Sequence, residues 1–225
     1  MPDCFKEAGA IITYNVEAAE FTSINVGEGI EIILQEGTER KVMVETGEYL
    51  KDDITISVSN GELILKNNSS CNWVRDYNIT KVHINTPVLE KIYSSSQFTV
   101  RSVGTLNFPN LELQSGLFEE TASGSFELQV NCQNLTVQDN ESIYCNINGY
   151  AENLSVNFYS GDARFNGANL IAQNISIYHR SSNDIIVNPQ QQVAGTIAST
   201  GNLVLVNQPP VIEVGQLYTG SLMYW

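Results

Sequence analysis

The chain has 225 residues, of which 42% are hydrophobic and 16% charged, and its 25 acidic against 11 basic side chains give a formal net charge of −14. The hydrophobic content supports a sizeable core and excludes a disordered chain. The acidic balance argues against nucleic acid and anionic lipid as partners, because both are bound through lysine and arginine.

The first 20 residues are interpreted as a short lead-in. Their start, Met1-Pro2-Asp3-Cys4, lacks the apolar core of a secretory signal, and no stretch of the chain reaches the ~20 apolar residues that span a bilayer. An export signal or lipid-anchor segment upstream of this sequence therefore stays open. Glu17-Ala18-Ala19-Glu20 is helix-like but too short to form a helix alone.

Residues 21–86 alternate between apolar and polar side chains, a period of two that predicts strands. The clearest local signal is Asn60-Gly61, which lies between the alternating runs Ile54–Val58 and Leu63–Leu65. Asn and Gly tolerate the positive φ angles of a type I′ turn, so this stretch predicts a tight β-hairpin. We expect a hairpin-rich first part of the fold.

Residues 87–206 contain a repeat, marked by a pair of small turn residues after a short apolar alternation. The pairs are Ser95-Ser96, Ser115-Gly116, Asp139-Asn140, Ser160-Gly161, Ser181-Ser182 and Thr200-Gly201, with spacings of 20, 24, 21, 21 and 19 residues. A near-constant period with a small residue at a fixed phase is typical of repeat architectures. Because the first residue of the pair changes between Ser, Asp and Thr, we interpret this column as a line of turns and not as a row of nucleophiles.

Each repeat predicts two strands, one on either side of the turn. The first strand is usually entered through an asparagine, namely Asn110, Asn134, Asn153 or Asn174. No helix-length apolar period separates the strands, which excludes a βαβ fold and leaves a parallel solenoid or an antiparallel sandwich. Equal spacing at every return favours the solenoid, in which each ~20-residue unit is one coil. We therefore predict an all-β chain with a continuous parallel β-helix-like solenoid over residues 21–206.

Residues 207–225 differ in composition, with Pro209-Pro210 followed by an aromatic end, Tyr218 to Trp225. A solenoid end exposes unpaired strand edges that need cover, so the prediction for this segment is a capping tail. An aromatic patch that binds a partner is the alternative.

The four cysteines are Cys4, Cys71, Cys132 and Cys145. They form no Cys-x-x-Cys pair and the chain has two histidines, so neither a metal nor another cofactor is expected. Cys4 and Cys71 lie in polar flanks, and a disulfide between them would suit an exported protein. Cys145 lies on the apolar phase of an alternation, which predicts a buried thiol, whereas the state of Cys132 stays open.

One catalytic arrangement was tested around His179, the only histidine near the turn column. A hydrolase triad would combine it with Ser181 and Asp184, but residues this close on a strand alternate faces. Nothing in the sequence marks a nucleophile elbow or an oxyanion hole. No catalytic residue is therefore assigned.

A second arrangement is a possible ligand contact at the turns. Asp162 and Asp184 follow successive turn pairs, so stacked coils would place them near each other, together with Arg164 or Arg180. Such a group could contact an acidic sugar or Ca²⁺, or serve glycoside cleavage, although aspartate is also favoured at turns for its local hydrogen bonds. Tyr159 and Tyr178 are added as aromatic contacts for a sugar, with core or edge packing as the alternative.

The repeats resemble the bacterial head GIN domain family, which is classed among auto-transporter-type adhesins and is common in Bacteroidetes. Ser160-Gly161-Asp162-Ala163 matches the family's strand–turn–strand unit best, and Phe21-x-x-Ile24-x-Val26 resembles its opening. The resemblance covers roughly residues 20–206, and the segments around Cys4 and Cys71 look like one subgroup. It implies a right-handed β-helix-like solenoid, export as an outer-membrane lipoprotein or surface protein, and an adhesion role without catalytic residues.

The leading hypothesis is a non-enzymatic protein of the cell surface, outer membrane or periplasm that binds glycans or other proteins. Two alternatives stay open. One is a polysaccharide lyase or glycosidase built on the same scaffold, and the other is a structural envelope protein that oligomerises.

Overall fold

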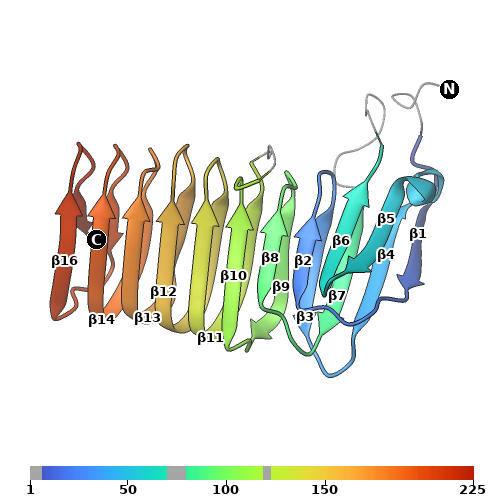
Figure 1. The fold of residues 1–225 in the computed structure, drawn as a ribbon, viewed down its shortest axis with the longest axis horizontal. Helices are drawn as coiled ribbons and strands as arrows, with labels where there is room; N and C mark the ends of the chain where they lie inside the picture. Colours follow the sequence, from blue (N-terminus) through green and yellow to red (C-terminus); the bar gives the residue numbers. More distant parts are fainter. Residues whose placement is uncertain (1–6, 70–79, 119–122) are drawn as a thin grey trace.

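The computed structural model describes residues 7–69, 80–118 and 123–225. It shows an elongated β-solenoid of about 6 turns with repeats of ~21 residues, and 63% of the residues lie in strands. The turns stack side by side along the long axis of the molecule (Figure 1). The predicted all-β solenoid is therefore confirmed. Both cysteines of the expected Cys4–Cys71 disulfide lie outside the described residues.

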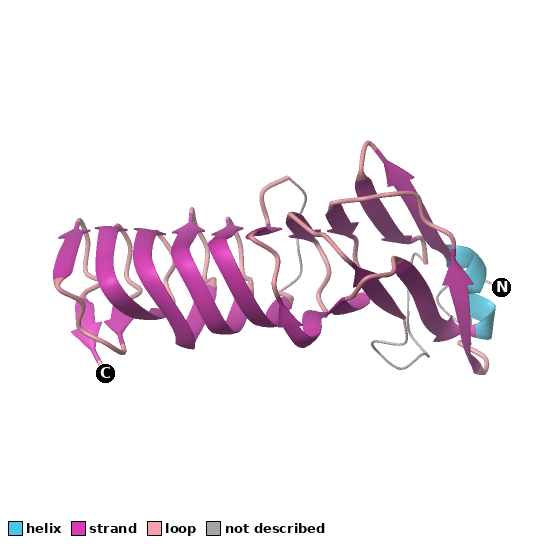
Figure 2. Ribbon diagram, turned by 90° about the horizontal axis from the view of Figure 1, so that it is seen from below, coloured by secondary structure: helices cyan, strands magenta, loops and turns pink. Residues whose placement is uncertain are grey.

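Four long strands form the middle of the solenoid, each crossing a bend between two flat faces (Figure 2). They are β11 (Ser125–Asp139), β12 (Tyr144–Phe158), β13 (Arg164–His179) and β14 (Ile185–Ile197). Each pairs in parallel with the next, so the second predicted strand of one repeat runs directly into the first strand of the following repeat.

In-register stacking explains the core. Leu135 pairs with Leu154, Leu154 with Ile175, and Ile175 with Val193, and all four side chains are at most 3% exposed. Identical phase at every turn lets each coil bury its inward side chains against those of its neighbours. The outward side chains alternate with them and form the surface of the stack.

Shorter strands extend the stack on both sides of these four. They are β8 (Lys91–Ser94), β9 (Thr99–Leu106), β10 (Asn110–Ser115), β15 (Leu203–Leu205), β16 (Val211–Gln216) and β17 (Leu222–Tyr224). β16 pairs in parallel with β14, and β17 pairs in parallel with β15. The segment 207–225, expected as a capping tail, thus continues the solenoid as its last turn.

The N-terminal part combines solenoid strands with antiparallel additions. Its elements are β1 (Ile11–Val16), β2 (Ser23–Val26), β3 (Glu31–Glu36), β4 (Lys41–Gly47), the 3₁₀-helix η2 (Glu48–Asp53), β5 (Ile54–Ser59), β6 (Glu62–Asn67) and β7 (Lys81–Thr86). β2 and β3 pair in parallel with the first repeats, whereas β4 is antiparallel to both β1 and β7. Strand β1 lies in the segment expected as an unstructured lead-in.

The hairpin at Asn60-Gly61 is confirmed. β5 and β6 pair antiparallel on either side of it, and Asn60 and Gly61 have φ angles of 51° and 77°. Both angles lie in the left-handed region that a type I′ turn requires. Helix η2 was not expected, and Glu17–Glu20, the one helix-like run, is not helical. Among the described residues, no helix is long and apolar enough to cross a membrane.

The column of small residues forms one corner line of the coils. Its buried hydroxyls donate to backbone carbonyls of the preceding turn: Ser115 Oγ to Ser94 O at 2.8 Å, and Ser181 Oγ to Ala163 O at 2.6 Å. A carbonyl at a corner has no ladder partner, so a small hydroxyl that reaches back satisfies it. These serines are therefore committed to the corners.

Candidate functional site

The second flat face of the four long strands carries a grid of twelve outward side chains, which we call the amide face. In the order β11, β12, β13, β14, its three columns are Asn134, Asn153, Asn174, Gln192; Thr136, Ser155, Ser176, Ala194; and Gln138, Asn157, Tyr178, Thr196. The alternation of the strands turns these positions outward while Leu135 and Val137 and their equivalents point into the core.

The amide face is uncharged. None of its twelve positions is an Asp, Glu, Lys or Arg, although the whole chain has a net charge of −14. The second column meets a carboxylate only at its two ends, where Glu112 of β10 pairs with Thr136 and Glu213 of β16 pairs with Ala194. The face therefore offers amide and hydroxyl groups and no ionic contact.

A ladder of asparagine side chains runs along one margin of this face. Asn174 Nδ2 donates to Asn153 Oδ1 at 3.1 Å, and Asn153 Nδ2 donates to Asn134 Oδ1 at 2.9 Å. The ladder continues beyond the face, where Asn134 Nδ2 donates to Asn110 Oδ1 at 2.7 Å. Parallel in-register stacking puts equivalent side chains one strand spacing apart, which is the reach of one amide–amide hydrogen bond.

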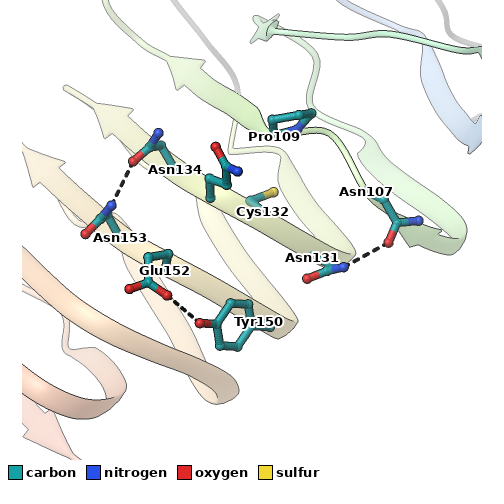
Figure 3. A pocket seen from close by; sticks show the side chains of 9 residues that line it. Asn107, Pro109, Asn131, Cys132, Asn134, Tyr150, Glu152 and Asn153 are labelled. Carbon is teal, nitrogen blue, oxygen red and sulfur yellow. Dashed lines mark hydrogen bonds between the residues drawn. The ribbon is translucent and has the colours of Figure 1, made fainter.

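Two grooves flank the ladder and share Asn134 and Asn153 in their walls. The larger has a volume of about 580 Å³ and lies at the bend, where Tyr150 donates to Glu152 at 2.5 Å (Figure 3). The smaller has about 320 Å³ and runs over the face itself, past Ser155 and Ser176. Both volumes lie in the range of small-ligand sites, ~300–1,000 Å³.

A tyrosine pair closes the other margin of the amide face. The rings of Tyr159 and Tyr178 lie 5.9 Å apart, tilted by 43°, and both residues are 37% exposed. They contact each other although Tyr159 falls two positions beyond Asn157, the partner of Tyr178 in the ladder. Sequence phase alone therefore concealed a contact between two of the residues expected to meet a ligand.

The predicted pair of aspartates does not form. Asp162 lies beside Ser182, because Asp162 N–H and Ser182 N–H donate to successive carbonyls of the stack, whereas Asp184 lies beside Arg164. The turn 159–164 is one residue longer than the turn 180–184, which shifts the two acids out of one column.

Asp184 and Arg164 serve the turns instead. Asp184 Oδ1 accepts from the backbone N–H of Asn202 at 2.9 Å and from its side chain at 3.0 Å. The Arg164 guanidinium donates to Asn183 Oδ1 at 3.3 Å. Arg180 is exposed at the corner beyond Tyr178. Among the described residues, no group of three or more His, Cys, Asp and Glu could hold a metal ion.

The triad tested around His179 is ruled out by burial. His179 is fully buried against Phe158 at a ring distance of 6.5 Å, and burial lowers its pKa. The Ser181 hydroxyl is engaged with a backbone carbonyl, so it cannot serve as a nucleophile. Cys145 is buried as predicted, and Cys132, which was left open, is also buried and free.

Sequence reasoning noted the recurring asparagines but assigned them to strand entry. The signal for a site was the combination of Asn at that position with Thr or Ser two residues later, as in Asn134-Leu135-Thr136, Asn153-Leu154-Ser155 and Asn174-Ile175-Ser176. Once the solenoid is accepted, residues two apart share a face, so these repeats predict a polar grid.

Solved structures with this fold come from intestinal Bacteroidetes. A "putative adhesin" from Bacteroides fragilis aligns with a TM-score of 0.88 and 19% identity, covering 98% of this chain and 100% of its own. A "putative lipid binding protein" from Parabacteroides distasonis aligns with a TM-score of 0.69 and 17% identity, covering 96% and 97%. A "putative adhesin" from Parabacteroides merdae aligns with a TM-score of 0.61 and 16% identity, over the same shares of the two chains.

At these identities the structural matches show the fold alone. Comparison with curated proteins finds no match. The family assignment rests on the sequence itself, since residues 20–209 match the family described as "Putative auto-transporter adhesin, head GIN domain", and this chain therefore belongs to that family.

Proposed function

We propose that this protein is a non-enzymatic, exported adhesive scaffold that holds onto a glycan or protein surface through the amide face. The observation that carries the proposal is the face itself, an uncharged grid of amides and hydroxyls over four strands, bordered by two grooves and a tyrosine pair. A rigid stack presents such a grid with little loss of conformational entropy on binding.

The chemistry of the described residues supports binding over catalysis. Glycoside cleavage normally uses two carboxyl groups that flank the scissile bond. Among the residues that line the two grooves of the amide face, Glu152 is the one carboxylate, and it is hydrogen bonded to Tyr150. Asp162 and Asp184, considered for an enzymatic role, do not share a column.

Family membership supports export to the cell surface, outer membrane or periplasm, with a lipid anchor upstream as the expected attachment. One structural neighbour is named a lipid binding protein, but the grooves of this chain are lined largely by amides and hydroxyls. Buried apolar lining is the usual requirement for a lipid tail, so a surface ligand is favoured.

Binding of the purified protein to intact bacterial cells and to mucin-coated and collagen-coated surfaces tests the proposal. The expected result is saturable binding to at least one surface, without release of cleaved products from polysaccharides. Binding through an uncharged face should also persist when salt is raised, because screening acts on ionic contacts. Absence of saturable binding to every surface, or accumulation of new reducing ends in a polysaccharide, would contradict it.

A further inference from the structure

We propose that the amide face binds an extended, neutral glycan chain laid along the solenoid axis, with successive sugars contacting successive strands β11 to β14. This inference rests on the proposed function and names its ligand class. It is carried by the hydrogen-bonding capacity, the period and the charge of the face.

The ladder leaves half of its hydrogen-bonding groups for a ligand. An asparagine amide has two N–H donors and an oxygen with two lone pairs. In the ladder, Asn153 uses one N–H toward Asn134 and one lone pair from Asn174, while its side chain is exposed. Each such amide therefore presents a donor and an acceptor, which is what a sugar hydroxyl needs, since it also donates and accepts.

The ladder also orients these groups. Because each amide is held by its neighbours on both sides, its free N–H and C=O keep one direction at every strand. A ligand meets preorganised groups and does not have to order flexible side chains, a cost of about 0.5–1.5 kcal/mol for each.

The period of the face matches a linear polymer. Neighbouring strands lie about 4.8 Å apart, so equivalent side chains repeat at that distance along the axis. A hexose in an extended β-linked chain advances by a comparable length. Ser155 and Ser176 occupy the same column on adjacent strands, so two consecutive sugars would meet nearly the same surroundings.

Charge decides between classes of glycan. The amide face contains no cation that would pair with a uronate or a sulfate, and Glu112 and Glu213 stand at its two ends. An acidic chain would be desolvated without compensation and repelled by the net charge of −14. A neutral glycan avoids both costs.

The aromatic content favours a glycan over a protein. Protein interfaces are usually anchored by several buried aromatic or arginine side chains at the centre of the patch. Here Tyr178 is the one aromatic residue in the grid, at its margin, and its ring packs against Tyr159. A half-exposed tyrosine pair at the edge suits stacking on the apolar face of a pyranose ring.

Calorimetric titration of the intact protein with neutral hexasaccharides of β-linked glucose, mannose and xylose, and with hexagalacturonate as the acidic probe, tests this inference. A neutral probe is expected to bind and the acidic one is not. Tyr178→Ala should weaken binding about five- to tenfold, since an aromatic contact contributes about 1 kcal/mol. Asn153→Ala should weaken it about tenfold.

Tyr144→Ala is the matched control, because Tyr144 is 38% exposed, almost as much as Tyr178, but begins β12 on the other side of the bend. Truncation of an exposed ring leaves the core intact, so Tyr178→Ala keeps the test valid even if the Asn153 variant is unstable. Equal loss in both tyrosine variants, or preference for the acidic probe, overturns the inference.

The two proposals fail in different ways. If the protein binds cells or coated surfaces but none of the neutral hexasaccharides, the glycan inference is overturned and the adhesive function stands. If it binds no surface at all, the adhesive function falls and takes the inference with it. Neutral binding lost in Tyr178→Ala and kept in Tyr144→Ala supports both.

Discussion

The buried carboxyl of Asp139 should make stability depend on pH in an unusual direction. Asp139 is fully buried at the end of β11, beside Phe158 of the next turn. Its Oδ2 accepts from Glu141 N–H at 2.7 Å, whereas Oδ1 has no partner among the described residues. Burial raises the pKa of Asp139 from 3.8 to about 6, against the opposing effect of the Glu141 hydrogen bond.

The sign follows from proton binding. Between pH 3.8 and about pH 6 the folded protein keeps this proton and the unfolded chain loses it, so the free energy of unfolding falls as pH rises through this window. At about 1.4 kcal/mol per pH unit, the loss reaches about 3 kcal/mol above pH 6. Asp139→Asn removes the titration, so its stability relative to wild type should rise by up to about 3 kcal/mol between pH 4 and pH 8.

Urea unfolding followed by circular dichroism at several pH values measures this difference. Titration of all other groups is common to both proteins and cancels. Asp162→Asn, the same substitution at an exposed turn residue, controls for the general effect of losing one acid. A difference between Asp139→Asn and wild type that stays constant over the whole pH range would refute the reasoning.

Three further predictions concern the turns, the ladder and the thiols. Gly161→Ala should lower the melting temperature much more than Gly61→Ala, because both glycines have a φ of 77° but an added Cβ meets a backbone carbonyl at 1.9 Å only at Gly161; equal shifts would contradict this. Asn153→Ala removes two ladder hydrogen bonds and should cost about 1–3 kcal/mol in urea unfolding, so an unchanged midpoint would speak against the ladder. Burial raises the pKa of Cys132 to about 11 and that of Cys145 well above its usual range, so mass spectrometry should find both unlabelled by a thiol reagent until the protein unfolds.

Local chemistry explains what was predictable. The hairpin at Asn60-Gly61 could be read from two residues, because only a few residue types tolerate positive φ angles at both positions. The solenoid could be read from the period of the turn pairs, since a repeated phase implies that each coil meets the same neighbours. Burial of Cys145 followed from its position on the apolar phase of its strand.

Register explains what was not. The prediction that Asp162 and Asp184 would meet was wrong because one additional residue in the turn 159–164 moves the acids into different columns. The same kind of offset brings Tyr159 onto Tyr178, which fall at different phases of their repeats. Turn length acts across coils, so it alters which side chains are neighbours without changing the alternation within any strand.

The sequence by itself determined the all-β class, the solenoid period and the line of corners, because each of these depends on residues close together in the chain. Only the tertiary structure decided the antiparallel position of β1, the last turn built by β16 and β17, and the asparagine ladder with its grooves. These features join residues that lie about one repeat or more apart, and stacking of the coils is the physical event that brings their side chains within hydrogen-bonding distance.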